Sequence, residues 1–357
     1  MDKILYVGDN PVKTTNGGDW IKKKNILALK EIYKNNLHTF PIKCTNSYIT
    51  FLNLLNNYML GLSPNITNKI LSYIEQNNIE AVFLMSSKLG KLAWRINSTF
   101  PEVKIYIFFH NIEKQYTEEE CRINPSWKNR FIAKVTAYNE ALACKYADKL
   151  ILLNQRDNFL LKKIYNKEAD LLLPTSFIDH YNSDLKKSTT KKDKRFTLLF
   201  VGFAFYANIE GVKWFIKNVL PELHNCKLQI IGSGMDKVFK STDTIEVYGY
   251  VEDLSIFYYQ ADVVILPIFS GGGMKTKTAE ALMYGCPIVG TKEAFEGYEL
   301  DYDRIGGLTN TSKDMIQKIN ELENDKISLH SKSKYARFIF NQKYSINSTI
   351  DTLKQSL

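Results

Sequence analysis

Long apolar runs are absent from this chain, and nothing in it approaches the roughly 20 apolar residues that a membrane-spanning helix requires. Cysteine is also scarce, because the 5 cysteines are scattered and form no C-x-x-C pair. An odd, dispersed set argues against a disulfide framework and favours reduced thiols in a cytoplasmic protein. The start, MDKILYVGDN, leads directly into a strand, so we expect neither a signal peptide nor a transit peptide.

Signatures of nucleic-acid binding are missing too, since the sequence shows no helix-turn-helix, zinc finger or RNA-binding motif. The charge is nevertheless uneven. Residues 1–180 hold 24 Lys and Arg against 17 Asp and Glu, whereas residues 181–357 hold 23 against 21. A basic first half favours a polyanion or an anionic membrane surface, and the missing motifs favour the membrane. We expect no nucleic-acid partner, and a cytoplasmic protein or one held peripherally at the inner face of a membrane.

What the sequence does contain is a regular alternation of strands and helices over 357 residues, enough for two domains. Strands in the first half are expected at Ile4–Val7, Ala81–Met85, Lys104–Phe109, Lys149–Leu153 and Asp170–Leu173. Strands in the second half are expected at Thr197–Val201, Lys227–Ile231, Ile245–Tyr248, Val263–Leu266 and Ile288–Gly290. This alternation predicts an α/β protein of two doubly wound, Rossmann-like domains facing a central cleft, with ligands at the carboxyl ends of the strands.

Composition sets the expected boundaries of these domains. Residues 1–180 form the first domain and residues 196–340 the second. Between them, residues 181–195 are polar and carry six basic side chains, which is typical of a solvated linker; a nucleic-acid arm is the alternative. Residues 341–357 are expected to form a C-terminal helix that can pack back on the first domain.

The most informative stretch is ADVVILPIFSGGGMKTKTAEALMYGCPIVGT (Ala261–Thr291). It predicts a buried strand, a triple-glycine turn, a helix over Met274–Tyr284 and another strand. Glycine amides and the positive end of a helix attract an anion, and Lys275 and Lys277 add full charges there. The alternative, a surface pair of Lys277 with Glu280 worth about 0.2–0.5 kcal/mol, leaves lysines unneutralised at the positive helix end. The pattern predicts a site for a phosphate attached to a sugar.

Two other segments place candidate residues at strand ends. In VGFAFYANIEGVKWF a strand ends at Gly202, and Asn208 can cap the helix that follows; an ordinary strand–helix junction is the alternative. In FFHNIE, His110 ends a strongly apolar strand, where a satisfied core histidine is the alternative. Both segments are expected at the ligand-binding edge of their sheets.

Two stretches suit a helix lying at a membrane surface. ITFLNLLNNYMLGL (Ile49–Leu62) groups apolar residues beside asparagines, and WKNRFIAKVTAY (Trp127–Tyr138) mixes aromatic with basic residues. Amphipathic helices more often face a core, which is the alternative for both.

The order VGF…NIEGVKWF…IIGSG…VYGYVEDL…ADVVILPIFSGGGMKTKTAEALMYGCPIVGT resembles the retaining GT-B glycosyltransferases of the "glycosyl transferases group 1" kind, family GT4, in a triple-glycine subgroup. The resemblance is specific across Phe196–Thr291 and looser over the first domain. It implies transfer of a sugar from a nucleotide-diphosphate sugar to a hydroxyl of a glycan or lipid-linked acceptor, with retention, in bacterial-type surface polysaccharide synthesis. It implies no cofactor and no metal, because lysines supply the charge; the D-x-D of Asp301 and Asp303 is expected in a surface loop.

The resemblance also implies roles for single residues. Glu280 matches a glutamate that binds the ribose, and Lys277 and Lys275 match basic residues on the diphosphate. His110 matches a histidine near the transferred sugar. The residues implied to line the base pocket are Gly232, Gly234, Tyr250 and Val251. The glycines implied to offer N–H groups to the sugar and phosphate are Gly271, Gly272 and Gly273. A first-domain loop on the acceptor side is matched by Gly17, Gly18 and Asp19, where a plain turn with Asp19 as helix cap is the alternative.

The sequence departs from the family pattern at two places. Many relatives carry a glutamate where Gly272 stands, and an Arg and a Lys where this chain has Phe203–Asn208. The departures leave open the usual contact to the sugar 3-hydroxyl. Two other functions stay open as well: a sugar-nucleotide epimerase of the same architecture, and a non-catalytic partner in a glycan-synthesis complex.

Overall fold

The structure, a computed structural model, describes residues 2–9, 17–42, 47–190, 194–270 and 274–357. The chain divides into two compact units. Unit 1 comprises Met1–Thr175 together with Thr349–Leu357, and unit 2 comprises Ser176–Ser348. The segment expected as a linker, residues 181–195, belongs to unit 2 and includes the short helix α8 (Ser183–Ser188).

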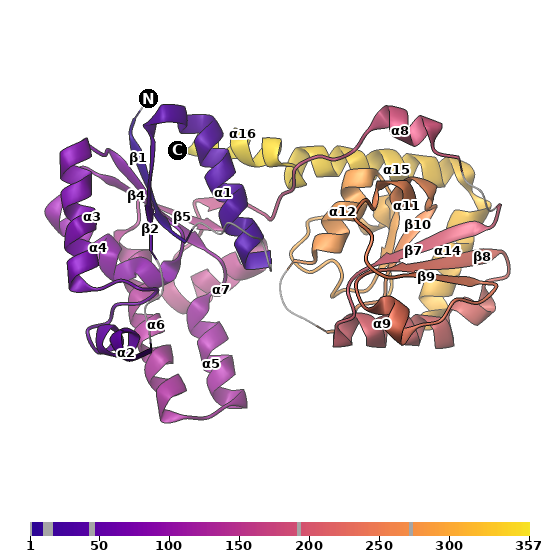
Figure 1. Cartoon of the computed structure of the whole chain (residues 1–357), viewed down its shortest axis with the longest axis horizontal. Coiled ribbons are helices and arrows are strands. Elements are labelled where there is room, and N and C mark those ends of the chain that lie inside the picture. The colour runs from indigo at the N-terminus through magenta and orange to yellow at the C-terminus, as the bar shows by residue number, and fades with distance from the viewer. Residues whose placement is uncertain (1, 10–16, 43–46, 191–193, 271–273) are drawn as a thin grey trace. The chain divides into compact units, whose positions relative to one another are not determined.

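Unit 1 is built on one six-stranded parallel sheet with helices on both faces (Figure 1). Its strands are β1 (Ile4–Gly8), β2 (Leu37–Pro41), β3 (Ala81–Leu84), β4 (Lys104–Phe109), β5 (Lys149–Leu152) and β6 (Leu171–Leu172). Its helices are α1 (Gly17–Tyr33), η1 (Lys34–Asn36), α2 (Ser47–Leu55), α3 (Pro64–Asn77), η2 (Ser87–Leu89), α4 (Gly90–Thr99), α5 (Glu113–Ile123), α6 (Trp127–Tyr146) and α7 (Gln155–Tyr165).

The order of these strands across the sheet is β2-β1-β3-β4-β5-β6. The chain therefore runs outward from β1 to β2 and then returns to the other side of β1 with β3. The central strands β1 and β3 are buried along their whole length, as expected of parallel strands covered on both faces. The switch in direction lies between β1 and β3, and ligands of doubly wound folds bind at the carboxyl ends of such a pair.

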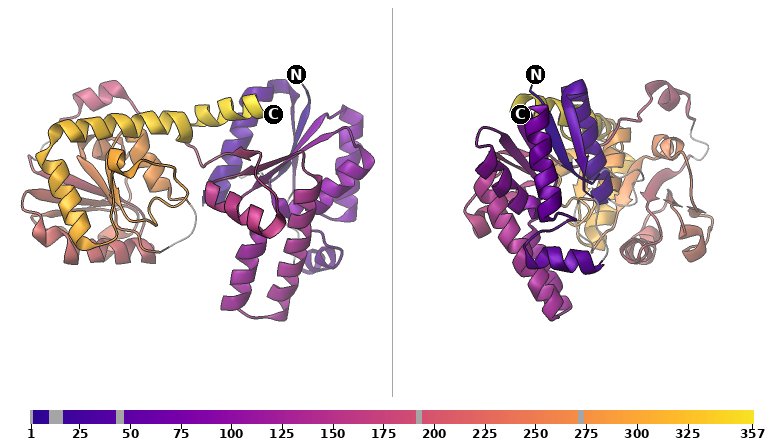
Figure 2. Two further views of the ribbon diagram at one scale, coloured as in Figure 1. Left: turned by 180° about the vertical axis from the view of Figure 1, so that it is seen from behind. Right: turned by 60° about the vertical axis from the view of Figure 1, so that its left-hand side comes forward.

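Unit 2 repeats this architecture (Figure 2). Its strands are β7 (Phe196–Val201), β8 (Cys226–Ile231), β9 (Ile245–Tyr248), β10 (Val263–Leu266), β11 (Ile288–Gly290) and β12 (Gly306–Leu308). Besides α8, its helices are α9 (Tyr206–Asn218), η3 (Leu220–Glu222), α10 (Met235–Val238), α11 (Ser255–Gln260), α12 (Thr276–Tyr284), α13 (Tyr302–Ile305), α14 (Ser312–Asn324), α15 (Lys326–Ile339) and the π-helical turn η4 (Phe340–Tyr344). The last helix, α16 (Ile346–Ser356), begins in unit 2, and its residues from Thr349 onward belong to unit 1.

The strands of the second sheet follow the order β12-β11-β10-β7-β8-β9, and all neighbours are parallel. The switch point of this sheet lies between β7 and β10. The α/β class and the two Rossmann-like halves expected from the sequence are confirmed. The ten expected strands all recur within a residue or two, except that β6 is shortened to Leu171–Leu172.

Candidate functional site

The switch point of unit 2 brings together two segments that the sequence singled out. Gly202 follows β7, and the segment Pro267–Lys275 connects β10 to α12, so both lie at the carboxyl edge of the sheet. The three glycines of this connection, Gly271, Gly272 and Gly273, lie outside the described residues. The residues before and after these glycines are described, and α12 begins at Thr276.

Lys277 lies in the first turn of α12, and its ammonium group points to the end of β7. Its Nζ donates a hydrogen bond of 2.5 Å to Oδ1 of Asn208 and lies 5.1 Å from the centre of the Phe200 ring. A β-carbon placed on Gly202 would lie 3.2 Å from the same nitrogen. The charge of Lys277 is therefore held where both strands of the switch point end.

Burial, and after it repulsion from Lys275, lowers the pKa of Lys277 to about 8. The interaction with Glu280 acts in the opposite direction and is smaller. A buried ammonium without a full counter-charge favours binding of an anion, because the anion stabilises its protonated form. The local electrostatics thus suit a phosphate.

Asn208 does not cap its helix, in contrast to the sequence-based expectation. Helix α9 begins at Tyr206 after Phe205, three residues earlier than such a cap requires, and no side chain caps it. The buried Asn208 amide instead donates from Nδ2 to the carbonyl of Phe203 at 2.8 Å while Oδ1 accepts from Lys277. Its role in the structure is to connect the loop after β7 to α12.

Lys275 lies just before α12, not inside it, because the helix begins at Thr276 and not at Met274. Its ammonium makes an ion pair of 2.6 Å with Glu293, which belongs to the loop after β11. The same loop holds the start of α12 through two further bonds: Thr278 Oγ1 donates to the carbonyl of Ala294, and the Tyr298 hydroxyl donates to the carbonyl of Lys275. The amino end of α12 is therefore firmly positioned.

Glu280 lies one turn after Lys277 and accepts a hydrogen bond of 3.2 Å from the hydroxyl of Tyr258. Burial is the main effect on this carboxyl group and raises its pKa, against the hydrogen bond from Tyr258 and the charge of Lys277. Tyr258, on α11, is fully enclosed and stacks on Tyr284. The hydroxyl of Tyr258 thus orients the carboxylate of Glu280, and the Glu280 side chain remains partly exposed.

The neighbouring strand ends carry the residues expected around a base. Gly232 directly follows β8 with φ +154°, and a β-carbon on it would lie 2.0 Å from the carbonyl oxygen of Gly202. Only glycine allows this approach of the two loops. Gly234 directly precedes α10, and Tyr250 and Val251 follow β9, with Tyr250 78% exposed. The ends of β7, β8, β9 and β10 thus lie along one edge of the sheet.

Unit 1 has a cavity of about 480 Å³ at the corresponding edge of its own sheet. The cavity is lined by residues that follow β1, β3 and β4 and by parts of α1 and η2: Gly8, Asp9, Lys22, Ile42, Leu60, Met85, Ser86, Lys88, Leu89, His110 and Glu113. Its walls combine aliphatic side chains with two ion pairs, Lys88–Glu113 at 2.8 Å and Lys22–Asp9 at 3.4 Å. Such a mixture suits a ligand with both apolar and polar groups.

His110 lies in this cavity, half-buried, directly after β4. Its Nε2 is 3.1 Å from the carbonyl oxygen of Met85. Burial, with repulsion from Lys22 as a second cause, lowers the pKa of His110 to about 4, so the ring is neutral at neutral pH. A neutral ring next to a backbone carbonyl donates from Nε2, which leaves Nδ1 as an acceptor.

The glycine loop of the first domain lies mostly outside the described residues. Helix α1 begins at Gly17, followed by Gly18 and Asp19 in its first turn. The Asp19 carboxylate lies 3.6 Å from the ammonium of Lys22, which is one of the residues lining the cavity. The start of α1 is therefore connected to the cavity through Lys22.

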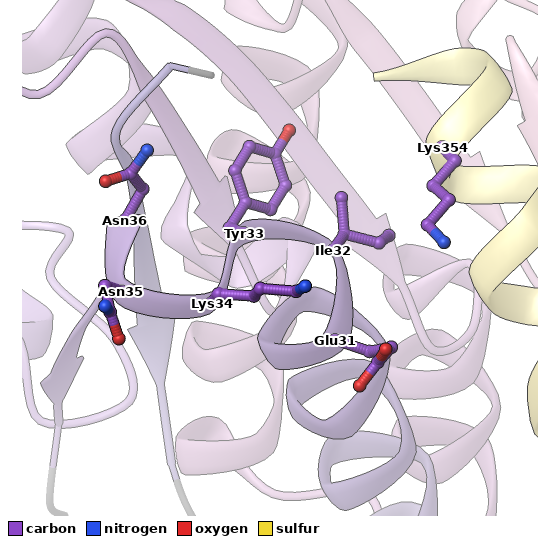
Figure 3. Close-up of a pocket in the computed structure, with 7 residues that line it drawn as sticks. All are labelled: Glu31, Ile32, Tyr33, Lys34, Asn35, Asn36 and Lys354. Carbon is purple, nitrogen blue, oxygen red and sulfur yellow. The ribbon is translucent and has the colours of Figure 1, made fainter.

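A second cavity, of about 460 Å³, lies at the opposite edge of the unit 1 sheet (Figure 3). It is lined by the end of α1, by η1 before the start of β2, and by Lys354 of α16: Glu31, Ile32, Tyr33, Lys34, Asn35, Asn36 and Lys354. This is the amino edge of the strands, where doubly wound folds rarely bind ligands. We therefore assign no catalytic role to it.

Two further sequence expectations concern metals and membranes. In the D-x-D segment, the Asp301 side chain caps α13 by accepting from the backbone N–H of Arg304 at 3.2 Å. Among the residues whose positions are described, no group of three His, Cys, Asp or Glu side chains is arranged to hold a metal ion. Every helix in the described ranges is too short or too polar to cross a bilayer.

Sequence reasoning missed residues that act through the tertiary structure. Tyr258 orients Glu280, and Glu293 pairs with Lys275, yet each comes from an element remote in sequence from its partner. Lys22 and Lys88 line the cavity of unit 1 without a local motif. Lys88 follows soon after the end of β3, which gives a weak signal, whereas Lys22 lies inside α1 and has none.

Comparison with known proteins concerns the fold and the second unit. Residues 195–325 match the family described as "Glycosyl transferases group 1". Similar solved structures include sucrose-phosphate synthase of Thermosynechococcus elongatus (13% identity, TM-score 0.66) and Anabaena HepE in complex with UDP (13%, 0.64). Another is the lipopolysaccharide outer core galactosyltransferase WaaB in its apo form (11%, 0.64). In all three the similarity covers 99% of this chain and 98% of the other. Among curated proteins none matches.

At these identities the solved structures establish the fold, and the family match concerns unit 2. Its matched segment starts just before β7 and ends after α14, so it contains Asn208, Lys277 and Glu280. The chain has the GT-B fold of glycosyltransferases, and its second unit carries the match to the glycosyl transferases group 1 family.

Proposed function

We propose that the protein is a retaining glycosyltransferase that moves a sugar from a nucleotide-diphosphate sugar to a hydroxyl of a glycan or lipid-linked acceptor. The observation that carries the proposal is the buried ammonium of Lys277, bound to Asn208 at the switch point of a sheet inside the matched family segment. The Anabaena HepE structures with UDP, with UDP and glucose, and with UDP-glucose support a nucleotide-sugar donor by similarity of fold.

In this proposal the diphosphate binds at the amino end of α12. Lys277 contacts it directly, while Lys275, whose ammonium also pairs with Glu293, adds positive charge nearby. Negative charge gathers on the diphosphate as the glycosidic bond breaks, so these groups stabilise the transition state more than the bound donor. The lysines supply the charge that a metal ion provides in other enzymes, and we propose metal-independent transfer.

The other residues position the substrates. Glu280, held by Tyr258, accepts hydrogen bonds from the ribose hydroxyls, and the loops with Gly232, Gly234 and Tyr250 surround the base. In unit 1, the neutral His110 orients the transferred sugar. Gly17, Gly18 and Asp19 are proposed to contact the acceptor. The pathway we propose is synthesis of a bacterial-type surface polysaccharide.

A thermal-shift screen against UDP, GDP, dTDP, ADP and CMP tests the donor site. A ligand at 100 times its dissociation constant stabilises the protein by about 2.7 kcal/mol, which is enough to detect. We expect one nucleoside diphosphate to raise the melting temperature and Lys277→Ala to abolish this shift.

With a donor identified, turnover of Lys277→Ala is expected to fall by about 10²–10³. Lys213→Ala on the exposed face of α9 serves as the control and should leave turnover unchanged. Near-normal turnover of the Lys277 variant would contradict the proposal, as would stabilisation by none of the nucleotides.

A further inference from the structure

Unit 1 exposes a group of apolar side chains that the proposed catalytic residues do not explain. Trp127 at the start of α6 is 71% exposed and Ile123 at the end of α5 is 77% exposed. On α2, Phe51, Leu52 and Leu55 are 36%, 43% and 54% exposed. We call these five side chains the tip surface, because the α5–α6 hairpin extends away from the sheet of unit 1 (Figures 1 and 2).

Phe51 of α2 and Trp127 of α6 connect two elements of the tip surface. The Phe51 ring packs edge-on against Trp127, with 6.3 Å between ring centres, and lies 6.5 Å from the ring of Phe131. Ile123 and Trp127 flank the short connection between the two helices. Single exposed apolar residues are ordinary, but several exposed apolar side chains on elements that contact each other indicate an interaction surface.

The segment from the end of α5 through the first half of α6 carries charges of one sign. Between Cys121 and Asn139 the chain carries four basic residues and no acidic one, and all four are exposed: Arg122, Lys128, Arg130 and Lys134. Within the described part of the chain none of the four makes an ion pair. Helix α2 carries no charge at all. The tip therefore combines aromatic and aliphatic groups with unpaired positive charge.

Acidic residues begin further back on the hairpin. Glu118, Glu119 and Glu120 are exposed on α5, and Glu119 accepts a hydrogen bond from Gln115. Their charge disfavours deep burial of the hairpin in an anionic layer but leaves the tip free to contact it. The distribution suits a shallow contact made by the tip alone.

We propose that the tip surface docks on the headgroup layer of a bilayer that contains anionic lipids. Tryptophan is favoured at the boundary between water and acyl chains, and exposed lysines and arginines attract anionic headgroups. A second copy of this chain is disfavoured, because two basic tips repel each other. A protein partner with an acidic apolar groove is the other occupant, and it would leave both kinds of vesicle unbound. The inference goes beyond sugar transfer and depends on none of the donor-site residues.

Co-sedimentation with lipid vesicles tests the proposal. The full chain should bind vesicles of phosphatidylcholine mixed with phosphatidylglycerol far better than vesicles of phosphatidylcholine alone, and salt should weaken this binding. The difference between the fluorescence spectra of the wild type and of Trp127→Phe gives the emission of Trp127. This emission should shift to shorter wavelength when the protein binds vesicles. Binding to neither kind of vesicle would overturn the proposal.

Two pairs of variants separate the apolar from the charged contribution. Arg130→Gln with Lys134→Gln should lower the partition coefficient about fivefold per charge, since each basic residue near an anionic surface contributes about 1 kcal/mol. Ile123→Ala with Trp127→Ala should lower it by at least about tenfold, because their apolar area no longer leaves water.

The matched controls lie on α7 of the same unit. Phe159→Ala removes an aromatic side chain that is 66% exposed, and Lys163→Gln with Lys167→Gln removes two exposed charges from α7 and the loop after it. The controls should bind vesicles like the wild type. Equal loss in controls and tip variants, or dimers in sedimentation velocity that only the tip variants dissociate, would overturn the proposal. The nucleotide-induced thermal shift reports on the donor site separately, and every variant should retain it.

Discussion

In the proposed function most of the chemistry depends on Lys277, and its protonation gives a test of the site. Without a ligand, burial and Lys275 hold the pKa of Lys277 at about 8. A bound diphosphate favours the charged form and raises this pKa, so above pH 8 binding requires uptake of a proton. Affinity for the stabilising nucleotide should therefore fall above pH 8, by up to about tenfold per pH unit.

Calorimetric titration from pH 6 to pH 10 measures this dependence. Lys277→Arg is the informative variant, because a guanidinium stays charged over the whole range. Its affinity is expected to be lower than that of the wild type but nearly independent of pH. The same decline in the arginine variant would show that another group is responsible.

Lys24 offers a second test, in unit 1. It is fully buried on α1, and its Nζ donates to the carbonyl of Pro174 at 2.9 Å. Burial lowers its pKa to about 7, whereas in the unfolded chain it is about 10.4. Between these values the folded state loses the proton first, so this group makes the free energy of unfolding rise with pH.

The substitution Lys24→Met removes this effect. The free energy of unfolding of the variant should exceed that of the wild type by the largest amount below pH 7. Above pH 7 this difference should shrink by up to about 1.4 kcal/mol per pH unit. Urea unfolding of both proteins over this pH range gives the difference directly. A difference that does not change with pH would mean that Lys24 is charged in the fold throughout.

The candidate residues that the sequence predicted best are those that follow strands. A residue directly after a parallel strand must lie at the carboxyl edge of the sheet, and so must the first turn of the helix that follows the strand. Gly202, His110 and Lys277 could therefore be placed without a structure. Their partners could not. The bonds of Lys277 with Asn208, Lys275 with Glu293, and Glu280 with Tyr258 depend on which loops the folded sheet brings together.

Helix α9 packs on β10 at a point where only a glycine fits. A β-carbon on Gly211 would lie 1.9 Å from the carbonyl oxygen of Pro267. In an exposed helix, alanine is about 1 kcal/mol more favourable than glycine, but here the added methyl group forces the two elements apart. Gly211→Ala is therefore expected to destabilise unit 2 by about 1–3 kcal/mol.

The same displacement should disturb Asn208 on α9 and weaken nucleotide binding. Urea unfolding and the nucleotide thermal shift measure the two effects, with Lys213→Ala on the exposed face of α9 as the control. A more stable Gly211→Ala protein would show that α9 has room to move.

The long buried strands and amphipathic helices were predictable because their patterns are local. Short elements were not, since three or four residues carry too little periodicity: β12, α10 and α13 have no clear signal. Helix α5 was also missed, because its acidic run resembles a solvated loop. In the stretch Ile49–Leu62, expected as a surface helix, α2 ends at Leu55. Helix α6 contains the stretch Trp127–Tyr138, but its Val135 and Thr136 are buried.

The two units share the chain unequally, because residues 349–357 return to unit 1. In that segment Leu353 is completely buried, and the carbonyl of Ser356 accepts a hydrogen bond from Lys149. Deletion of residues 349–357 should therefore lower the melting temperature of unit 1 while the nucleotide-induced shift of unit 2 persists. Hydrogen exchange resolved by peptide separates the two units; loss of protection in unit 2 alone would contradict this assignment.

The divided course of unit 1 also bears on how the protein is made. Domains usually fold as they leave the ribosome, the first one first. Here the sheet of the first unit emerges early, but Leu353 is synthesised only after all of the second unit. A nascent chain thus carries an incomplete first unit until residues 349–357 have been made, and chaperones that bind exposed apolar sites have the longest access to this half of the molecule.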